Sequence, residues 1–215
     1  MSQFILPTLY LFDNVFYPTT VIPLIINDAP SKKLIDHCFT KDLALALWFQ
    51  GENSKPIATM GKILQIEERH DGSLKVLLKG LRRVYLEKVV QQIPFPIYGA
   101  SAYNDFDREH FESRGQLEKF NTILNEWLFQ HVPSEKDRNE FLKDLDTAQK
   151  LIDHVSLLII QDVEIKQILL ECNSLNERMR LLDTLIKSPF EKEDLVATMA
   201  IKNFEKLDMA SGIKN

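Results

Sequence analysis

The sequence predicts an α+β protein with a β-rich half, residues 1–104, followed by an α-helical half, residues 105–215. Short apolar runs separated by turn residues fill the first half, whereas apolar residues in the second half recur every three to four positions. The charge also changes. Residues 1–104 contain 11 Lys and Arg and 9 Asp and Glu, whereas residues 105–215 contain 15 Lys and Arg and 22 Asp and Glu. We place the boundary at Asn104-Asp105-Phe106-Asp107.

The first half is organised around a predicted hairpin over residues 60–84, with its turn at His70-Asp71-Gly72. A two-residue Asp-Gly loop would mix apolar and charged side chains on one face. A three-residue loop with Gly72 in the left-handed conformation keeps that face apolar, so we expect the three-residue loop. The register that it sets pairs Ile66 with Val76, Leu64 with Leu78, and Glu67 with Lys75 as an exposed ion pair.

Further strands are expected on both sides of the hairpin. They cover residues 4–11, 21–26, 42–50, 84–93 and 97–103, and a helix covers about 28–40. Pro7 and Pro23 lie inside the first two strands, and a proline cannot donate to a ladder, which is typical of edges and bulges. Six or seven short strands with one helix predict a small, irregular, closed or half-closed barrel.

The second half should contain only helices. The first covers about residues 111–131 and carries an apolar stripe that includes Leu124 and Trp127. Helix-start signals follow in the form of residues whose side chains cap a first turn. They lie at Ser134, Asp162, Ser174 and Ser188, the last one before Pro189 and a final helix over about 189–207, and a further helix is expected to begin near Thr147.

Composition argues against several classes of protein. The net charge of −5 lacks the basic surplus of a nucleic-acid binder. Cys38 and Cys172 lie in apolar helical patterns, as expected for reduced, buried thiols of a cytoplasmic protein. No basic segment precedes the first apolar residues, and Asp13 interrupts them early, so neither a signal peptide nor a membrane span is predicted.

No pattern predicts catalysis, and we expect no catalytic, cofactor or metal site. The sequence has no phosphate-binding G-x-x-x-x-G-K-[ST] loop and no recognisable nucleophile–base pair. The cationic side chains of Arg82, Arg83 and Lys88 are expected on the exposed side of a strand, and the alternative is that they contact an acidic partner. The histidines show no metal-ligand spacing with cysteines or with one another. They are His37, His70, His110, His131 and His154.

Three stretches resemble one known family, the N-terminal domain of Lon protease. They are L-F-D-N-V-F-Y-P-T-T-V-I-P-L near the start, G-K-I-L-Q-I with D-G-S-L-K-V-L-L-K-G-L-R-R in the hairpin, and A-Q-K-L-I-D-H-V with D-V-E-I-K-Q-I-L-L-E in the helical half. The resemblance covers about residues 5–187 and explains the helix after Pro189 least well. Phe12 stands where the family usually has an arginine, so that arginine's role is not carried over.

The resemblance implies a PUA-like β-barrel subdomain followed by a helical bundle. It also implies a free-standing, non-catalytic substrate-binding domain, without the ATPase and peptidase domains, that binds exposed segments of unfolded polypeptide or a protein partner. Self-association into a homo-oligomer stays open. Two alternatives remain: a PUA-like RNA-binding module, which the acidic balance disfavours, and an enzyme whose site residues lie far apart in the sequence.

Three aromatic residues are the candidate polypeptide-binding site: Phe12, Phe16 and Tyr17, beside the Asp13-Asn14 turn. Three large rings within six residues do not easily all point into one small barrel, so some should face a bound polypeptide. The alternative hypothesis is that the rings plug the mouth of the barrel and touch the helical half. Mutation of Tyr17 separates the two hypotheses, since a buried aromatic contributes far more to stability than an exposed one.

Overall fold

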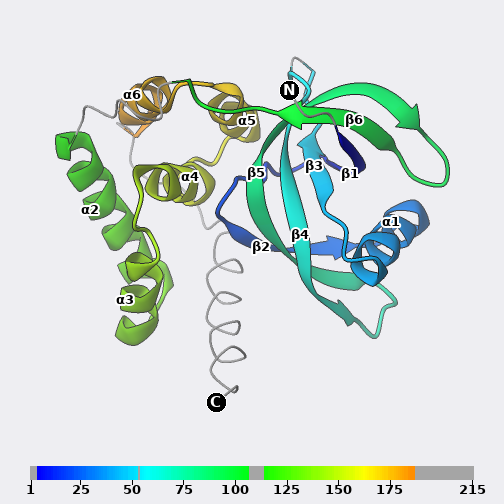
Figure 1. The fold of residues 1–215 in the computed structure, drawn as a ribbon. Coiled ribbons are helices and arrows are strands. Elements are labelled where there is room, and N and C mark those ends of the chain that lie inside the picture. The colour runs from blue at the N-terminus through cyan, green and yellow to red at the C-terminus, as the bar shows by residue number, and fades with distance from the viewer. Residues whose placement is uncertain (1–3, 53, 107–113, 187–215) are drawn as a thin grey trace.

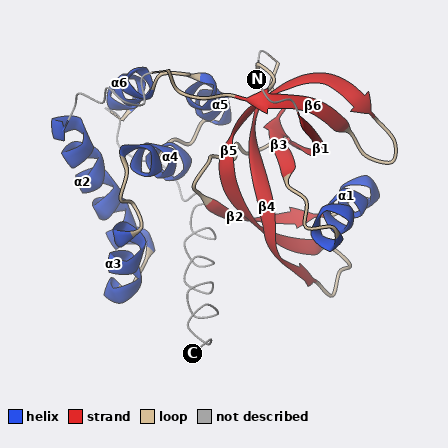
Figure 2. Cartoon of the chain, viewed as in Figure 1, coloured by secondary structure: helices blue, strands red, loops and turns tan. Residues whose placement is uncertain are grey.

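The computed structural model describes residues 4–52, 54–106 and 114–186, and it confirms the α+β class. Six strands and one helix come first, and the helices α2–α6 follow (Figures 1 and 2). The elements of the first half are β1 (Phe4–Leu11), β2 (Val21–Ile26), α1 (Ala29–Thr40), β3 (Leu45–Phe49), β4 (Ile57–Glu68), β5 (Leu74–Gln91) and β6 (Ile97–Ala102). Helix α1 lies on the opposite side of the sheet from α2–α6 (Figure 1).

The strands form one mixed sheet in the order β2-β5-β4-β3-β1-β6, with an additional pairing between β5 and β6. Only the β1–β3 pair is parallel among the described pairings. The first part of β5 pairs with β2 and its last part pairs with β6, so the sheet curls back on itself. Of the closed or half-closed barrel that we expected, the closed form is wrong, since the edge strand β2 pairs with β5 alone in the described part of the chain.

Strand β5 runs without a break from Leu74 to Gln91, so the predicted division into a hairpin strand and a separate strand over 84–93 is wrong. Gly80 instead lets another segment cross the strand. Its N–H donates to the Thr20 carbonyl at 2.8 Å, and its carbonyl accepts from the Thr19 N–H at 3.1 Å. A Cβ at this position would lie 2.2 Å from the Tyr17 carbonyl oxygen, so glycine marks a close backbone approach here.

The hairpin register is confirmed next to the turn and wrong further from it. Ile66 pairs with Val76, and Glu67 pairs with Lys75, whose Nζ lies 3.9 Å from the Glu67 Oε2. A register shift between Ile63 and Gln65 places Ile63, not Leu64, opposite Leu78. A bulge thus puts one extra residue into β4, which no pattern in the sequence indicates. The turn itself is as predicted, with Gly72 at φ +76°.

Replacing Gly72 with valine should lower the free energy of unfolding by roughly 1–2 kcal/mol, because a β-branched residue strains a backbone at positive φ. A Cβ at Gly72 meets nothing within 4 Å, so the cost comes from the backbone alone. Gly115→Val in α2 is the matched control, since a Cβ there also meets nothing and φ is not in the left-handed region. Denaturant unfolding measures both, and equal midpoints for the two variants would contradict the strain.

The second half contains five helices among the described residues. They are α2 (Arg114–His131), α3 (Glu135–Lys143), α4 (Ala148–Leu158), α5 (Val163–Glu171) and α6 (Leu175–Leu185). The predicted caps at Ser134, Asp162 and Ser174 are confirmed, since each side chain accepts a hydrogen bond from an N–H of the first turn. The helix expected to begin near Thr147 does so, and the Thr147 side chain caps it in the same way. The predicted helix over 189–207 lies outside the described residues.

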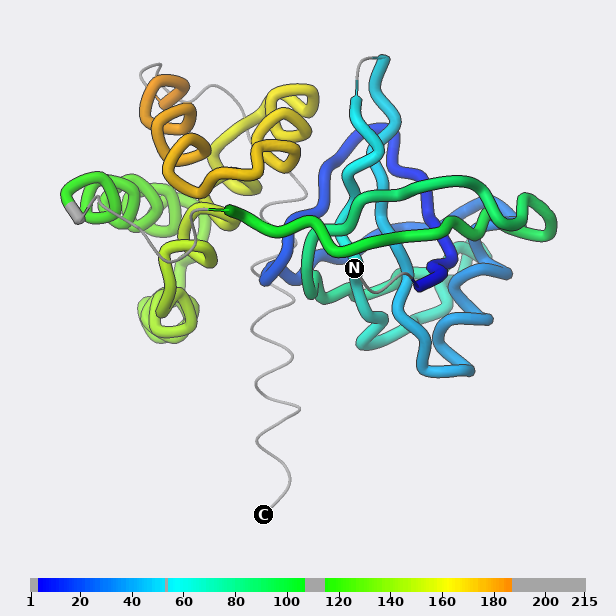
Figure 3. The backbone as a smooth tube through the Cα atoms, turned by 45° about the horizontal axis from the view of Figure 1, so that its top comes forward, coloured from blue at the N-terminus to red at the C-terminus, as the bar shows by residue number. Residues whose placement is uncertain are grey.

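One hydrophobic core runs through both halves. It includes Leu47 and Leu78 of the sheet together with Trp127, Val155 and Leu169 of the helices, all buried. Figures 1 and 3 show the helices of the second half on one side of the curled sheet, with α4 and α5 nearest to it. Because the core is shared, substitutions at the contact between the halves should destabilise the whole molecule.

Candidate functional site

A cavity of about 480 Å³ opens between β1, β2 and the start of α1. Most of the side chains that line it are apolar, and the charged ones are the two carboxylates of Asp13 and Asp28. The Asp28 carboxylate also accepts the Ser31 N–H at 2.8 Å and so caps α1. The complete lining is Thr8–Asp13, Leu24–Asp28, Pro30, Ser31, Leu34, Phe95 and Pro96.

The structure separates the three predicted contact residues. Phe12 lines this cavity, directly after β1, and is 71% exposed, whereas Phe16 and Tyr17 are 1% and 0% exposed. The sequence carries a signal for this difference: the polar pair Asp13-Asn14 divides Phe12 from the apolar run that contains the other two rings. The role of these residues in polypeptide binding stays a prediction, and only Phe12 offers an exposed ring for it.

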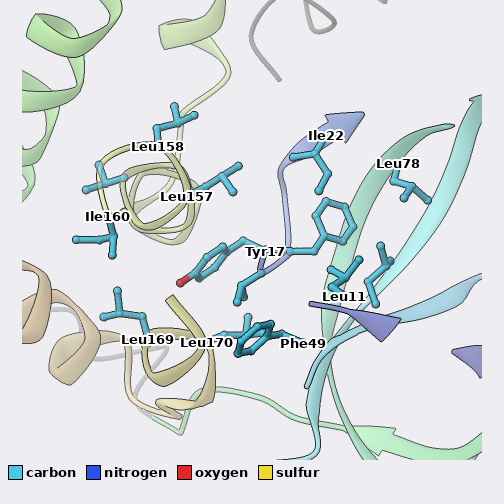
Figure 4. Close-up of a cluster of buried hydrophobic side chains, with 14 of the residues drawn as sticks. Leu11, Tyr17, Ile22, Phe49, Leu78, Leu157, Leu158, Ile160, Leu169 and Leu170 are labelled. Carbon is cyan, nitrogen blue, oxygen red and sulfur yellow. The ribbon is translucent and has the colours of Figure 1, made fainter. Parts of the chain in front are cut away.

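Tyr17 occupies the contact between the halves, as the alternative hypothesis described, whereas Phe16 is buried within the sheet half, where its ring lies 3.0 Å from the position of a Cβ at Gly61. Tyr17 lies between leucines of the helices, including Leu157 and Leu169, and residues of the sheet, including Phe49 (Figure 4). Its hydroxyl donates to the Lys166 carbonyl at 2.6 Å, which satisfies the one polar atom of a fully buried side chain. The Tyr17 ring therefore joins the sheet to α5 and α4 and holds the segment that leads from the cavity.

A buried ionic cluster lies at the same contact. The Asp105 Oδ1 accepts Arg83 Nη2 at 2.5 Å and Arg178 Nη2 at 2.9 Å, and Arg178 Nη1 lies 3.2 Å from the Asp153 Oδ1. None of the four side chains is more than 2% exposed, so two arginines and two carboxylates neutralise one another away from water. Because the four residues come from β5, the connecting segment, α4 and α6, the cluster fixes the halves together.

Arg83 corrects the expectation that this part of β5 exposes its cations. Its guanidinium also donates to the carbonyls of Leu170 at 2.8 Å and Cys172 at 2.5 Å, where α5 ends. The neighbouring Arg82 does lie exposed, as expected from strand alternation. Sequence reasoning missed Arg83 because the partners that make its burial favourable are distant in the chain.

Burial also shifts the pKa values of two adjacent residues in α4. Removal from water raises the pKa of Asp153 to about 7, with the opposing charge of Arg178 limiting the rise. Removal from water lowers the pKa of His154 to about 4. The neutral His154 ring packs against Phe141 with centroids 5.3 Å apart, and its Nδ1 lies 2.8 Å from the Lys150 carbonyl, so it has a structural role.

Replacing His154 with glutamine should remove an acid-dependent loss of stability. Since the pKa is lower in the folded state than in the unfolded chain, the unfolded chain binds the proton first, and stability falls as pH drops from 6.5 towards 4. The stability advantage of the parent over His154→Gln should therefore shrink by roughly 3 kcal/mol between pH 7.5 and pH 4. Denaturant unfolding across this range measures it, and a constant difference would contradict neutral burial.

Other kinds of site are not evident in the described residues. No group of three His, Cys, Asp or Glu side chains is arranged there to hold a metal ion. No helix within the described ranges has the length and apolar character needed to cross a membrane. A second cavity of about 300 Å³ lies between the sheet and α3–α4 and is lined by Lys79, Lys150 and His154 among others. Lys150 is already paired with Asp146 at 2.9 Å, so the larger cavity is the stronger candidate.

The fold is a two-part α+β module. Its curled sheet carries the apolar cavity and packs against a helical half. The chain belongs to the family of the ATP-dependent protease La (LON) substrate-binding domain, whose family model matches residues 5–188. The resemblance noted in the sequence is therefore confirmed. The final helix predicted over residues 189–207 falls outside this match.

Known proteins of similar sequence and fold agree with this assignment. The chain is 27% identical over 199 residues to Lon protease of Buchnera aphidicola subsp. Acyrthosiphon pisum, covering 86% of this chain and 25% of that protein. It is 27% identical to Lon protease of Xanthomonas oryzae pv. oryzae, covering 88% of this chain and 24% of that protein. The chain thus spans about a quarter of the length of these relatives.

Two solved structures share the fold. The N-terminal domain of the Mycobacterium avium complex Lon protease superposes with a TM-score of 0.65 at 17% identity, covering 86% of this chain and 100% of that one. A Lon N-terminal domain protein from Xanthomonas campestris gives 0.63 at 18% identity, covering 86% and 99%. At these identities the likeness establishes the fold alone.

Proposed function

We propose that this protein is a non-catalytic binding module that holds exposed apolar segments of polypeptide, in an unfolded protein or a protein partner, at the cavity between β1 and β2. The observation that carries the proposal is the apolar cavity of about 480 Å³ with the exposed ring of Phe12 beside it. This volume is within the range of sites that enclose several apolar side chains. Membership of a substrate-binding family supports polypeptide as the ligand.

Binding at this cavity requires no nucleotide, cofactor or metal ion. The driving force is removal of apolar surface from water, on the side of the ligand and on the side of Phe12. The cytoplasm, where the thiols of Cys38 and Cys172 stay reduced, is the location that we propose.

RNA is not favoured as the ligand. The charged side chains of the cavity are the carboxylates of Asp13 and Asp28, which repel phosphate groups. An RNA site needs cations that follow the backbone, and their release of counterions gives binding a steep dependence on salt. Titration of the protein with RNA at several salt concentrations should therefore give no such dependence.

Replacing Phe12 with serine should weaken the binding of a reduced, unfolded model protein about tenfold, as expected for loss of a central aromatic contact. The melting temperature should change little, because the ring is largely exposed. Phe129→Ser is the matched control: Phe129 is 74% exposed but lies on α2, away from the cavity. Fluorescence anisotropy without nucleotide gives the affinities, and thermal unfolding gives the stabilities.

Absence of binding by the parent protein would overturn the proposed function. Equal affinities for Phe12→Ser and Phe129→Ser would move the site away from this cavity.

A further inference from the structure

Two strands have an edge without a strand partner at this cavity. β1 pairs with β6 through Phe4–Pro7 and with β3, on its other edge, through Thr8–Leu11. Along Thr8–Leu11, therefore, no strand in the part of the chain that the structure describes pairs with the edge of β1 that faces β6. Among the described strands, β2 pairs on one edge only, with β5. Residues of both strands line the same cavity.

The backbone groups of Tyr10 point towards this open edge. The Thr8 N–H donates to the Pro96 carbonyl on the β6 side at 2.9 Å, and the Leu11 carbonyl accepts from the Gln50 N–H on the β3 side at 3.1 Å. Backbone N–H and C=O groups alternate between the two edges of a strand, so those of Tyr10 face the same side as those of Thr8. Tyr10 therefore directs one donor and one acceptor towards the cavity.

We propose that the bound segment adds to the sheet as a β-strand along the open edge of β1, with its backbone hydrogen-bonded to Tyr10. This inference rests on the proposed function and specifies how the same cavity is used. In an added strand every second side chain points to one face, so alternate residues of the segment enter the cavity. The backbone bonds supply affinity that does not depend on sequence, and the cavity selects apolar side chains at alternate positions.

The charge of the cavity determines which charged residues are favoured at the ends of the bound segment. Asp13 follows Phe12 at the end of β1 and is exposed, and no Lys or Arg of the described ranges lines the cavity. A lysine or arginine beside the apolar residues of the segment is therefore attracted by the Asp13 carboxylate, whereas a glutamate is repelled by it. Since Asp13 is in contact with solvent, this preference should weaken as salt is raised.

The probe is a synthetic seven-residue peptide with valine at alternate positions, serine between them and lysine at both ends. Two analogues carry N-methyl groups on one or the other set of alternate amides. Because only one set faces β1, one analogue should bind at least about tenfold more weakly, and the other should stay within roughly threefold of the parent peptide. Equal affinities of the two analogues would overturn strand addition.

The charge preference has its own comparison. Exchange of the terminal lysines for glutamates should weaken binding several-fold, and Asp13→Asn should reduce that discrimination. Asp36→Asn is the matched control, since Asp36 is exposed on α1 and does not line the cavity. Unchanged discrimination in Asp13→Asn would overturn the charge preference.

Failure of the inference and failure of the proposed function give different results. If the unmethylated peptide binds and Phe12→Ser weakens it, but the two methylated analogues bind alike, the cavity holds polypeptide without strand addition. If neither the peptide nor an unfolded protein binds, both proposals are wrong.

Discussion

Replacing Arg178 with methionine should destabilise the protein by about 3–5 kcal/mol, as is usual when one partner of a buried ion pair is removed. Arg178 is fully buried and bonds to both Asp105 and Asp153. Methionine fills similar space but leaves the Asp153 carboxylate without its arginine, so a charge or an added proton must be accommodated away from water. Denaturant unfolding at pH 7.5 measures the loss.

Two further variants test the cause of that loss. Arg180→Met, two residues along the same helix and exposed, should change stability by less than about 0.5 kcal/mol. Adding Asp153→Leu to Arg178→Met should recover part of the stability, because the unpaired carboxylate is then gone. A loss below about 1 kcal/mol for Arg178→Met would show that the cluster does not hold the halves together.

Replacing Tyr17 with serine should cost about 3–5 kcal/mol, within the range for truncating a buried aromatic. The ring is 0% exposed and packs between the sheet and the helices (Figure 4). Tyr17→Phe should cost about 1–2 kcal/mol, since it removes only the hydrogen bond to the Lys166 carbonyl. Thermal and denaturant unfolding separate the two contributions.

Tyr85→Ser is the control for Tyr17, because Tyr85 is 42% exposed on β5 and should tolerate the change much better. A Tyr17→Ser variant that unfolds like the parent but no longer binds unfolded protein would contradict the buried position and restore Tyr17 as a contact residue.

The features that follow from the sequence are those set by neighbouring residues. Gly72 determines the hairpin turn because few other residues adopt positive φ, and Ser134 and Ser174 begin helices because their hydroxyls satisfy first-turn N–H groups. The family follows from long, gapped motifs near the start, in the hairpin and in the helical half, and the family model confirms it over residues 5–188.

The features that were missed depend on residues far apart in the chain. β5 continues past Gly80 because the segment through Tyr17 crosses it there, and Arg83 is buried because Asp105 and the end of α5 receive its guanidinium. Neither contact leaves a local pattern. Of the predicted site, Phe12 lies at a cavity, Phe16 is buried within the sheet half, and Tyr17 faces the helical half, a difference that only the packing of the molecule decides.

The central claim is that polypeptide binds at the cavity between β1 and β2, and amide hydrogen exchange with a bound unfolded protein tests it most directly. Binding should slow exchange in residues 8–13 and 24–31, which contribute most of the cavity lining, and leave α2–α6 unchanged. Slowed exchange confined to α2–α6, or none in 8–13 and 24–31 under conditions where binding is saturated, would contradict the claim.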